Sequence, residues 1–314
     1  MPWDALDAEL AAVAGTVSVY AGRLGRRPAY TRLADTPHYA ASTMKVAVLA
    51  ALHRTAEAGQ VALDAPVPVV NEFDSARPGA ARFSCAADYD NDEAVWARLG
   101  GTAPLRWLAE RMIVRSSNLA TNLVLGRVGL PAVAQVWADS GARHSRTGRG
   151  IEDFAARDAG LDNQVTAADL AGLLGGIARS RIASPAACAA MLDVLLAQER
   201  REDLAAGLPP GTRIAHKNGW VRGVRHGAGV VFPDDAPRTR WWSAPACRRT
   251  GRAGGSATSG TSWPVGSSPG SRPWSGPPGT GWEPSTEPTV DMVPTCRSPR
   301  YAPTGSPLRC TPRS

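Results

Sequence analysis

The two lysines of the chain lie in settings where lysine can do chemistry. Among 35 basic residues only Lys45 and Lys217 are lysines, and the others are arginines. Arginine keeps its proton in proteins, whereas burial can lower the pKa of a lysine until it acts as a base. Ser42 precedes Lys45 by three residues in AASTMKVAVLAAL, so a helix would put both on one face, with the ammonium within reach of the hydroxyl. This pair is a candidate activated nucleophile, although codon bias alone could also leave two lysines.

Two further segments carry polar side chains between apolar runs. In RMIVRSSNLATNL, Ser116, Ser117 and Asn118 occupy a short break between two expected helices, where they can face a cleft or simply cap a helix. Lys217 ends an expected late strand just before Asn218-Gly219, a residue pair typical of turns. Each segment alone has an ordinary structural explanation.

Taken in order, the three segments resemble a known set of motifs. Ser42-x-x-Lys45, Ser116-Ser117-Asn118 and Lys217-Asn218-Gly219 resemble the S-x-x-K, S-D-N and K-T-G motifs of class A β-lactamases and penicillin-binding proteins. The segment 149–170 resembles the Ω-loop of that family, with Glu152 in the place of its catalytic glutamate. The resemblance covers about residues 3–236.

The resemblance implies four catalytic residues. Ser42 would be the acylated nucleophile, Lys45 its neighbouring base, and Ser116 the group that passes a proton to the leaving nitrogen. Glu152 would activate the water that releases the acyl group. Whether Lys45 or Glu152 accepts the proton during acylation is disputed for the family.

The resemblance also implies a substrate-binding set, namely Asn118, Lys217, Asn218, Gly219 and Trp220. Asn118 would bind the substrate amide and Lys45, Lys217 would attract the substrate carboxylate, and the backbone N–H groups of Ser42 and Trp220 would form the oxyanion hole.

Three positions depart from the family pattern. Ser117 replaces the acid of the second motif, which in the family mainly orders the loop. Asn218 replaces a threonine or serine that helps to hold the substrate carboxylate. Ala155-Ala156 occupies the stretch where the family has an asparagine near the hydrolytic water, and Asn163, farther along the chain, is a candidate substitute.

Hydrophobic patterning predicts how these residues are positioned. Residues 16–22 alternate as a strand and lead through a turn into a second extended run, and strands return at 213–217 and 224–232. Helices are expected between them, at 43–58, 105–113, 120–128, 131–139, after the cap Thr166 and after Ser184-Pro185. This order predicts an α+β fold with an antiparallel sheet built from both ends of the domain. The resemblance adds helices on both faces and an all-helical subdomain.

The composition changes near residue 237. Residues 241–314 hold 13 Pro, 12 Ser, 10 Gly and 9 Thr but only 4 residues of Leu, Ile, Val or Phe, too few for a packed core. We therefore divide the chain into a hydrolase-like domain, 1–236, and a tail, 237–314, that is either disordered or a frameshifted translation. Shifting the frame back by one base allows Ala-Leu-Val-Val at 239–242, a strand where the resembled fold needs one. In the frame as written, the sheet would be incomplete and lack a middle strand.

Charge and cysteine content argue against several other classes. Residues 241–314 supply +5 of the formal net charge of +7, and no basic stripe with aromatics lies in the body, so nucleic-acid binding has little support. No CxxC or His spacing suits zinc, and we expect no metal, no cofactor and a monomer. No segment reaches the length of a membrane span, and the N-terminus does not read as a signal peptide, which predicts a cytoplasmic protein unless the true start lies upstream.

The sequence thus predicts a serine hydrolase that opens a β-lactam through an acyl-enzyme on Ser42. A penicillin-binding or D,D-peptidase-like acyltransferase remains an alternative. So does a non-catalytic product of a frameshifted gene.

Overall fold

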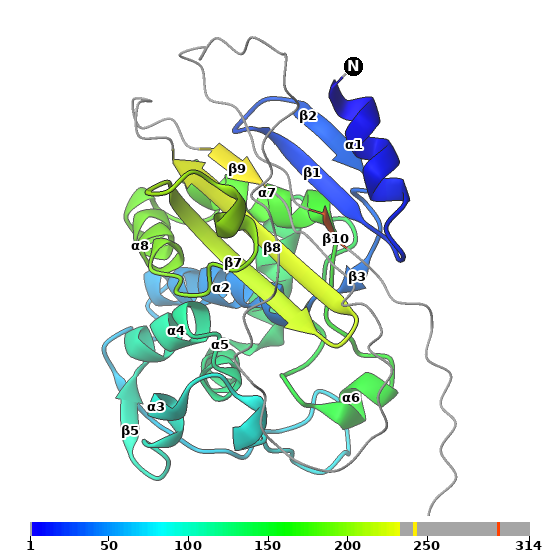
Figure 1. Cartoon of the computed structure of the whole chain (residues 1–314). Helices are drawn as coiled ribbons and strands as arrows, with labels where there is room; N and C mark the ends of the chain where they lie inside the picture. The colour runs from blue at the N-terminus through cyan, green and yellow to red at the C-terminus, as the bar shows by residue number, and fades with distance from the viewer. Residues whose placement is uncertain (1, 233–240, 244–293, 296–314) are drawn as a thin grey trace, which may run out of the picture.

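The computed structural model describes residues 2–232, 241–243 and 294–295, which form a mixed helix and antiparallel-sheet fold (Figure 1). The sheet is built from both ends of the domain, and a helical half lies below it in the view of Figure 1, as the sequence predicts. The first hairpin pairs β1 (Ser18–Arg23) with β2 (Pro28–Arg32). Helix α1 (Pro2–Ala11) covers its outer face, with Leu6 and Leu10 packed on buried Val19. Tyr20, one position along the strand, packs on the main core instead, because successive side chains in a strand point to opposite faces.

The second hairpin extends beyond its expected end. Strands β7 (Arg213–Val221) and β8 (Val224–Phe232) pair along nine residues each, from Arg213–Phe232 to Val221–Val224. Asn218-Gly219 therefore lies inside a strand, and the turn falls at Arg222-Gly223, where Gly223 supplies a φ of 82°. The expectation that Lys217 ends its strand is wrong, because the register places it at mid-strand opposite Ala228.

The middle of the sheet is occupied by a short strand. The order is β10-β1-β9-β8-β7, in which β9 (Trp241–Ser243) pairs with β1 through three residues and with β8 through the single pair Gly229–Ser243. Strand β10 (Pro294–Thr295) pairs with Ser18 and Val19 of β1. The sequence predicts that the middle strand is missing. This prediction is wrong, because Trp241–Ser243 form a short strand there. The remainder of the predicted tail, 237–314, lies outside the described residues.

The central helix α2 (Lys45–Glu57) follows a 3-10 turn, η1 (Ala41–Met44), and is buried along almost its whole length. Around it pack α4 (Leu105–Val114), α5 (Asn118–Asp139), α7 (Ala167–Ala178) and α8 (Pro185–Leu196). Thr166 and Ser184 cap α7 and α8 through their side chains, as the sequence predicts. The short elements are η2 (Ala87–Tyr89), α3 (Glu93–Trp96), α6 (Phe154–Asp158), η3 (Leu204–Gly207), and the strand pairs β3 (His38–Tyr39) with β6 (Gln164–Val165) and β4 (Pro66–Pro68) with β5 (Thr102–Pro104).

Helix α5 joins two segments that the sequence predicts as separate helices. The backbone leaves helical geometry only at Gly129, with φ 76° and ψ 152°, two residues before Pro131. At 22 residues and a mean hydropathy of 1.3, the combined element is long and apolar enough to span a membrane, contrary to the expectation from sequence. Its most apolar window is 50% buried inside the protein, and it packs against α2 and α4, as a core helix does.

Candidate active site

Ser42 lies in the 3-10 turn that leads into α2, and strand β7 approaches its backbone closely. A Cβ on Gly219 would stand 2.7 Å from the Ser42 nitrogen and 2.9 Å from the Thr43 nitrogen, closer than any side chain tolerates. Glycine at position 219 thus permits the contact that brings the third motif onto the first. The fold therefore sets the edge strand of the sheet against the backbone N–H of the candidate nucleophile.

Lys45 joins the first motif to the second. Its ammonium is fully buried and donates to the Ser116 carbonyl at 2.8 Å, to Asn118 Oδ1 at 2.9 Å and to Ser116 Oγ at 3.3 Å. A fourth, longer contact of 3.4 Å reaches the Ser117 carbonyl. Within the described residues, the hydrogen bonds of Lys45 thus go to the break before α5, not to Ser42 as the spacing alone suggests.

Burial lowers the pKa of Lys45 to about 7, against the opposing effect of the Asp90 and Glu152 carboxylates. A lysine with a pKa near neutrality can take up a proton and return it at physiological pH. Lys45 is therefore suited to exchange a proton with the Ser116 hydroxyl that it contacts.

The break before α5 holds a strained serine in front of a capped helix. Ser116 has a φ of 62°, unusual for a residue other than glycine, and the Ser117 hydroxyl accepts from the Ala120 N–H as the N-cap of α5. The helix cap that the sequence offers as an alternative is present, and it is Ser117. Ser116 and Asn118 contact Lys45 instead. Asn118 also donates from Nδ2 to the Tyr89 carbonyl at 3.0 Å, which fixes its amide at both ends.

Glu152 is buried with one oxygen bound and the other without a hydrogen-bond partner among the described residues. Oε2 accepts from the Ala86 N–H at 2.9 Å, and Oε1 is the oxygen without a partner. Burial raises the pKa of this carboxyl above its ordinary value. A buried carboxyl with a free acceptor oxygen can bind and deprotonate a water.

The Ω-loop is closed at its neck by Asn163. The Asn163 side chain accepts from the Gly148 and Arg149 N–H groups at 2.9 and 3.1 Å and donates to the Arg149 carbonyl at 3.2 Å. These bonds use its amide to tie the loop ends together, so Asn163 does not substitute for the family's asparagine near the water. Asp153, next to Glu152, accepts from Ser75 Oγ at 2.8 Å and anchors the loop from its other side.

Lys217 is the second fully buried ammonium. It donates to the Asn218 carbonyl at 2.8 Å and to Asn218 Oδ1 at 3.3 Å, while Asn218 Nδ2 donates to Asp203 Oδ2 at 3.3 Å. Burial and the nearby Lys45 charge lower the pKa of Lys217 well below its ordinary value. An anionic ligand beside it would raise that pKa again. Trp220 follows on β7 with a side chain that is 56% exposed.

Four residues around this cluster belong to none of the motifs: Tyr89, Asp90, Asn122 and Asp203. Asp90 and Asn122 hold backbone groups of the second motif and of the Ω-loop, and Asp203 holds Asn218. No local pattern marks them, because each acts on a segment far away in the chain.

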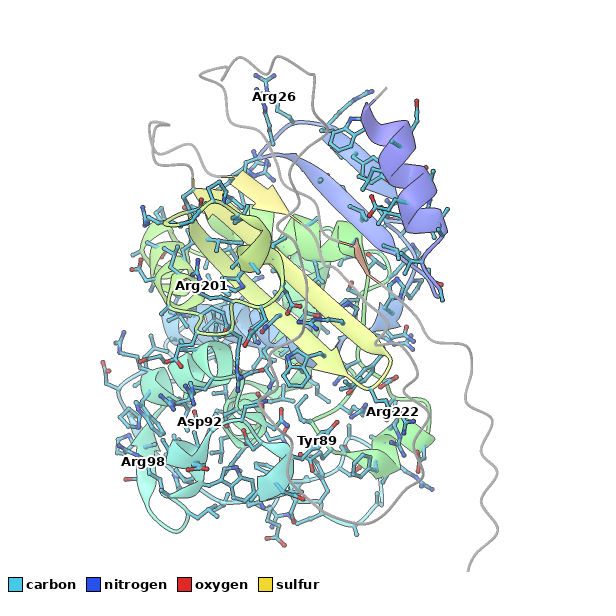
Figure 2. All side chains as sticks on the ribbon, in the orientation of Figure 1. Arg26, Tyr89, Asp92, Arg98, Arg201 and Arg222 are labelled. Atoms are coloured by element: carbon cyan, nitrogen blue, oxygen red, sulfur yellow. The ribbon has the colours of Figure 1, made fainter. Side chains whose placement is uncertain are left out.

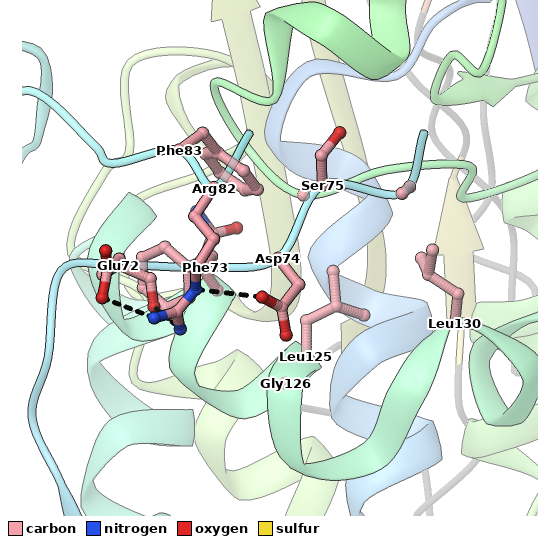
Figure 3. Close-up of a pocket in the computed structure, with 12 residues that line it drawn as sticks. Glu72, Phe73, Asp74, Ser75, Arg82, Phe83, Leu125, Gly126 and Leu130 are labelled. Carbon is pink, nitrogen blue, oxygen red and sulfur yellow. Dashed lines mark hydrogen bonds and ion pairs between the residues drawn. The ribbon is translucent and has the colours of Figure 1, made fainter. Parts of the chain in front are cut away.

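A pocket of about 390 Å³ is lined by the segment 72–83 and by α5 (Figure 3). Arg82 bridges Glu72 and Asp74 at its rim, and Asn122 and Gly150 form part of its wall. None of the predicted site residues lines this pocket. Nor does any group of three or more His, Cys, Asp or Glu side chains in the described part of the chain suit a metal ion.

Comparison with known proteins places the chain among relatives of this architecture. The family model described as "Beta-lactamase enzyme family" matches residues 1–239. A β-lactamase from Sphaerobacter thermophilus is 26% identical with a TM-score of 0.64, covering 77% of this chain and 88% of that one. A mutant of the class A β-lactamase of the last common ancestor of Gram-negative bacteria is 21% identical with a TM-score of 0.67, covering 81% and 91%. A mutant of PBP-A, solved as its acyl-enzyme complex with penicillin G, is 24% identical with a TM-score of 0.61, covering 78% and 85%. No curated protein matches the chain.

Proposed function

Because the chain belongs to the β-lactamase enzyme family, we propose that it is a serine hydrolase that opens cyclic amides of the β-lactam class through an acyl-enzyme on Ser42. The observation that carries the proposal is the buried ammonium of Lys45, bonded at once to Ser116 Oγ and Asn118 Oδ1. This contact unites a candidate nucleophile segment with a candidate proton donor in one network.

The proposed reaction has two halves. In acylation, Ser42 Oγ attacks the lactam carbonyl and loses its proton to the network of Lys45 and Glu152, and the backbone N–H groups of Ser42 and Trp220 stabilise the oxyanion. The C–N bond breaks as Ser116 delivers a proton to the ring nitrogen and is reprotonated through Lys45. In deacylation, Glu152 takes a proton from the water that attacks the ester and passes it to Ser42 Oγ as the ester C–O bond breaks. Asn118 would hold the substrate amide, and Lys217 with the Asn218-Gly219 segment would hold its carboxylate.

A penicillin-binding or D,D-peptidase-like acyltransferase is the second candidate. Two observations favour it: Asn163 is engaged at the neck of the Ω-loop, and Asn218 stands where a hydroxyl residue would be expected. The first feature would slow release of the acyl group, because no asparagine then holds the hydrolytic water, and the second would weaken the hold on the carboxylate of a β-lactam. The substrate in that case would be a peptide-like acyclic amide.

The proposal is tested by following hydrolysis of a chromogenic cephalosporin by the purified full chain and by Ser42→Ala. Ser84→Ala, which removes an exposed serine outside the motifs, is the control. We expect turnover by the native chain and by Ser84→Ala and none by Ser42→Ala. Equal turnover by Ser42→Ala would overturn the proposal.

A further inference from the structure

The second motif lacks an acid in its own sequence, yet a carboxylate lies on it. Asp90 comes from the loop between η2 and α3, 27 residues before Ser117. Its Oδ2 accepts from Ser117 Oγ at 3.1 Å, from the Asn118 N–H at 3.0 Å and from the Leu119 N–H at 2.8 Å. One oxygen thus contacts three consecutive residues of the break and the first turn of α5.

Asp90 is itself held in place from the other side. Trp96 Nε1 donates to Oδ2 at 3.0 Å, and the Asn91 N–H donates to Oδ1 at 2.6 Å. The preceding residue, Tyr89, accepts from Asn118 Nδ2. Tyr89 and Asp92 flank Asp90-Asn91 in the sequence, and Figure 2 shows these two labelled residues in the helical half below the β7–β8 hairpin. The segment around Asp90 is therefore fixed by its own hydrogen bonds and can hold the break in place.

The carboxylate also affects the charge balance of the site. It lies at the N-terminus of α5, where the helix dipole favours negative charge. Lys45 donates to carbonyl and side-chain oxygens of the same break. The ionisable groups that act on Lys45 there are Asp90, Cys85 and Glu152, with Lys217 as the neighbouring cation. Among these groups, Asp90 does most to raise the Lys45 pKa against burial.

We propose that Asp90 is a positioning residue that replaces, from a different loop, the acid missing at Ser117, and that its charge sets the shape of the Ser116–Asn118 break and acts through that break on Lys45. The kinetic part of this inference rests on the proposed function. The structural part does not.

The kinetic test compares a variant that lacks the Asp90 charge with one in which an acid at position 117 replaces that charge. Asp90→Asn keeps the side-chain shape and one acceptor but removes the charge, and Asp90→Asn with Ser117→Asp restores a charge within the motif. Asp88→Asn, which removes the charge of an exposed acid in the adjoining turn η2, is the matched control. The readout is the rate of Ser42 acylation by a fluorescent penicillin between pH 5 and 9, a range that brackets the pKa of about 7 of Lys45.

We expect Asp90→Asn to slow acylation at its optimum by roughly tenfold, as for loss of one charge-assisted hydrogen bond. Removing negative charge stabilises neutral Lys45 and lowers its pKa, so the midpoint of the rise in rate should move to lower pH. The double variant should regain both the rate and the midpoint, and Asp88→Asn should match the native chain. An unchanged midpoint in Asp90→Asn, or no recovery in the double variant, would overturn the proposal.

Thermal unfolding tests the structural part without any activity. Ser117→Asp should lower the unfolding midpoint of the native chain, because two carboxylates then crowd one helix end, and should raise that of Asp90→Asn. In a domain of this size, each kcal/mol of change in the free energy of unfolding shifts the unfolding midpoint by roughly 2–4 °C. If the native chain is never acylated, the proposed function fails and this cycle still decides the role of Asp90. If Ser117→Asp changes both backgrounds equally, the role of Asp90 is refuted while acylation can stand.

Discussion

The Asn122 side chain binds both backbone polar groups of Ile151, the residue immediately before Glu152. Oδ1 accepts from the Ile151 N–H at 2.8 Å, and Nδ2 donates to the Ile151 carbonyl at 2.9 Å. Glu152 itself has a φ of 68°, a conformation that costs energy in a residue other than glycine. Asn122 therefore holds in place the strained backbone that presents the carboxylate.

Asn122→Ala should slow deacylation more than acylation. Losing these two bonds frees the peptide before Glu152, whereas the contacts of Lys45 with Ser116 remain. We expect the acyl-enzyme lifetime to lengthen by about tenfold or more, as for loss of one or two net hydrogen bonds. Rates of adduct formation and loss, measured by rapid quench, check this. Gln135→Ala, on the exposed face of the same helix, is the control, and an unchanged lifetime in Asn122→Ala would show that Asn122 does not position Glu152.

Gly219→Ala should abolish most of the acylation activity. The added Cβ would meet the Ser42 nitrogen at 2.7 Å, so β7 must move away from the candidate oxyanion hole. Loss of one such donor costs roughly 10²–10³-fold in rate. Gly207→Ala adds a Cβ where nothing lies within 4 Å and should leave the acylation rate unchanged. Native-like acylation by Gly219→Ala would contradict the assigned geometry.

The chain should lose stability as the pH falls below about 6.5. Burial lowers the pKa of His216 to about 3 and that of His226 to about 4, so the unfolded chain binds protons that the folded chain excludes. Each histidine then contributes a slope of about 1.4 kcal/mol per pH unit between its folded and its ordinary pKa.

Urea unfolding at pH 7, 6 and 5 measures this slope. Neither ring nitrogen of His216 has a hydrogen-bond partner among the described residues, so His216→Leu removes the titration without breaking a bond and should flatten the slope. His226 contacts the Tyr39 carbonyl at 2.7 Å, so His226→Leu should also flatten the slope but lower stability at pH 7. An equal slope in His216→Leu would mean that this ring is already charged or exposed in the folded state.

The reading frame near residue 237 stays a prediction. The family match ends at residue 239, next to the predicted boundary, and β9 lies where the shifted frame would encode Val-Val at 241–242. Resequencing the gene across codons 230–245 tests the frameshift. A missing or extra base relative to the given frame is the expected result, and an unaltered sequence would leave the tail as an authentic part of the chain.

The parts of the fold that could be predicted are those with local signals. Alternation predicts β1, and an apolar, valine-rich run predicts β8. The side chains of Thr166 and Ser184 mark the starts of α7 and α8, where the structure has them. The turn at Arg222-Gly223 was missed because Asn218-Gly219 is the stronger local turn signal, and pairing with β8 outweighs it.

Within the site, residue order predicts which segments meet but not how they are held. The direction of Lys45 toward Ser116 is set by a contact between residues 71 positions apart. Asp90 and Asn122 act on segments 27 to 29 positions away, so no short pattern could identify them. The engagement of Asn163 at the loop neck likewise depends on where the two ends of the Ω-loop meet.

The proposed function requires that Ser42 form an acyl-enzyme and that Glu152 activate the water that hydrolyses it. Intact-mass spectrometry of the folded full chain mixed with a fluorescent penicillin, followed over time, tests it most directly. We predict a single adduct that rises and decays in the native chain, that persists in Glu152→Gln and that is absent in Ser42→Ala. Persistent labelling of the native chain, unchanged in Glu152→Gln, would assign it to the penicillin-binding acyltransferases instead. No adduct on a chain that unfolds cooperatively would contradict the account.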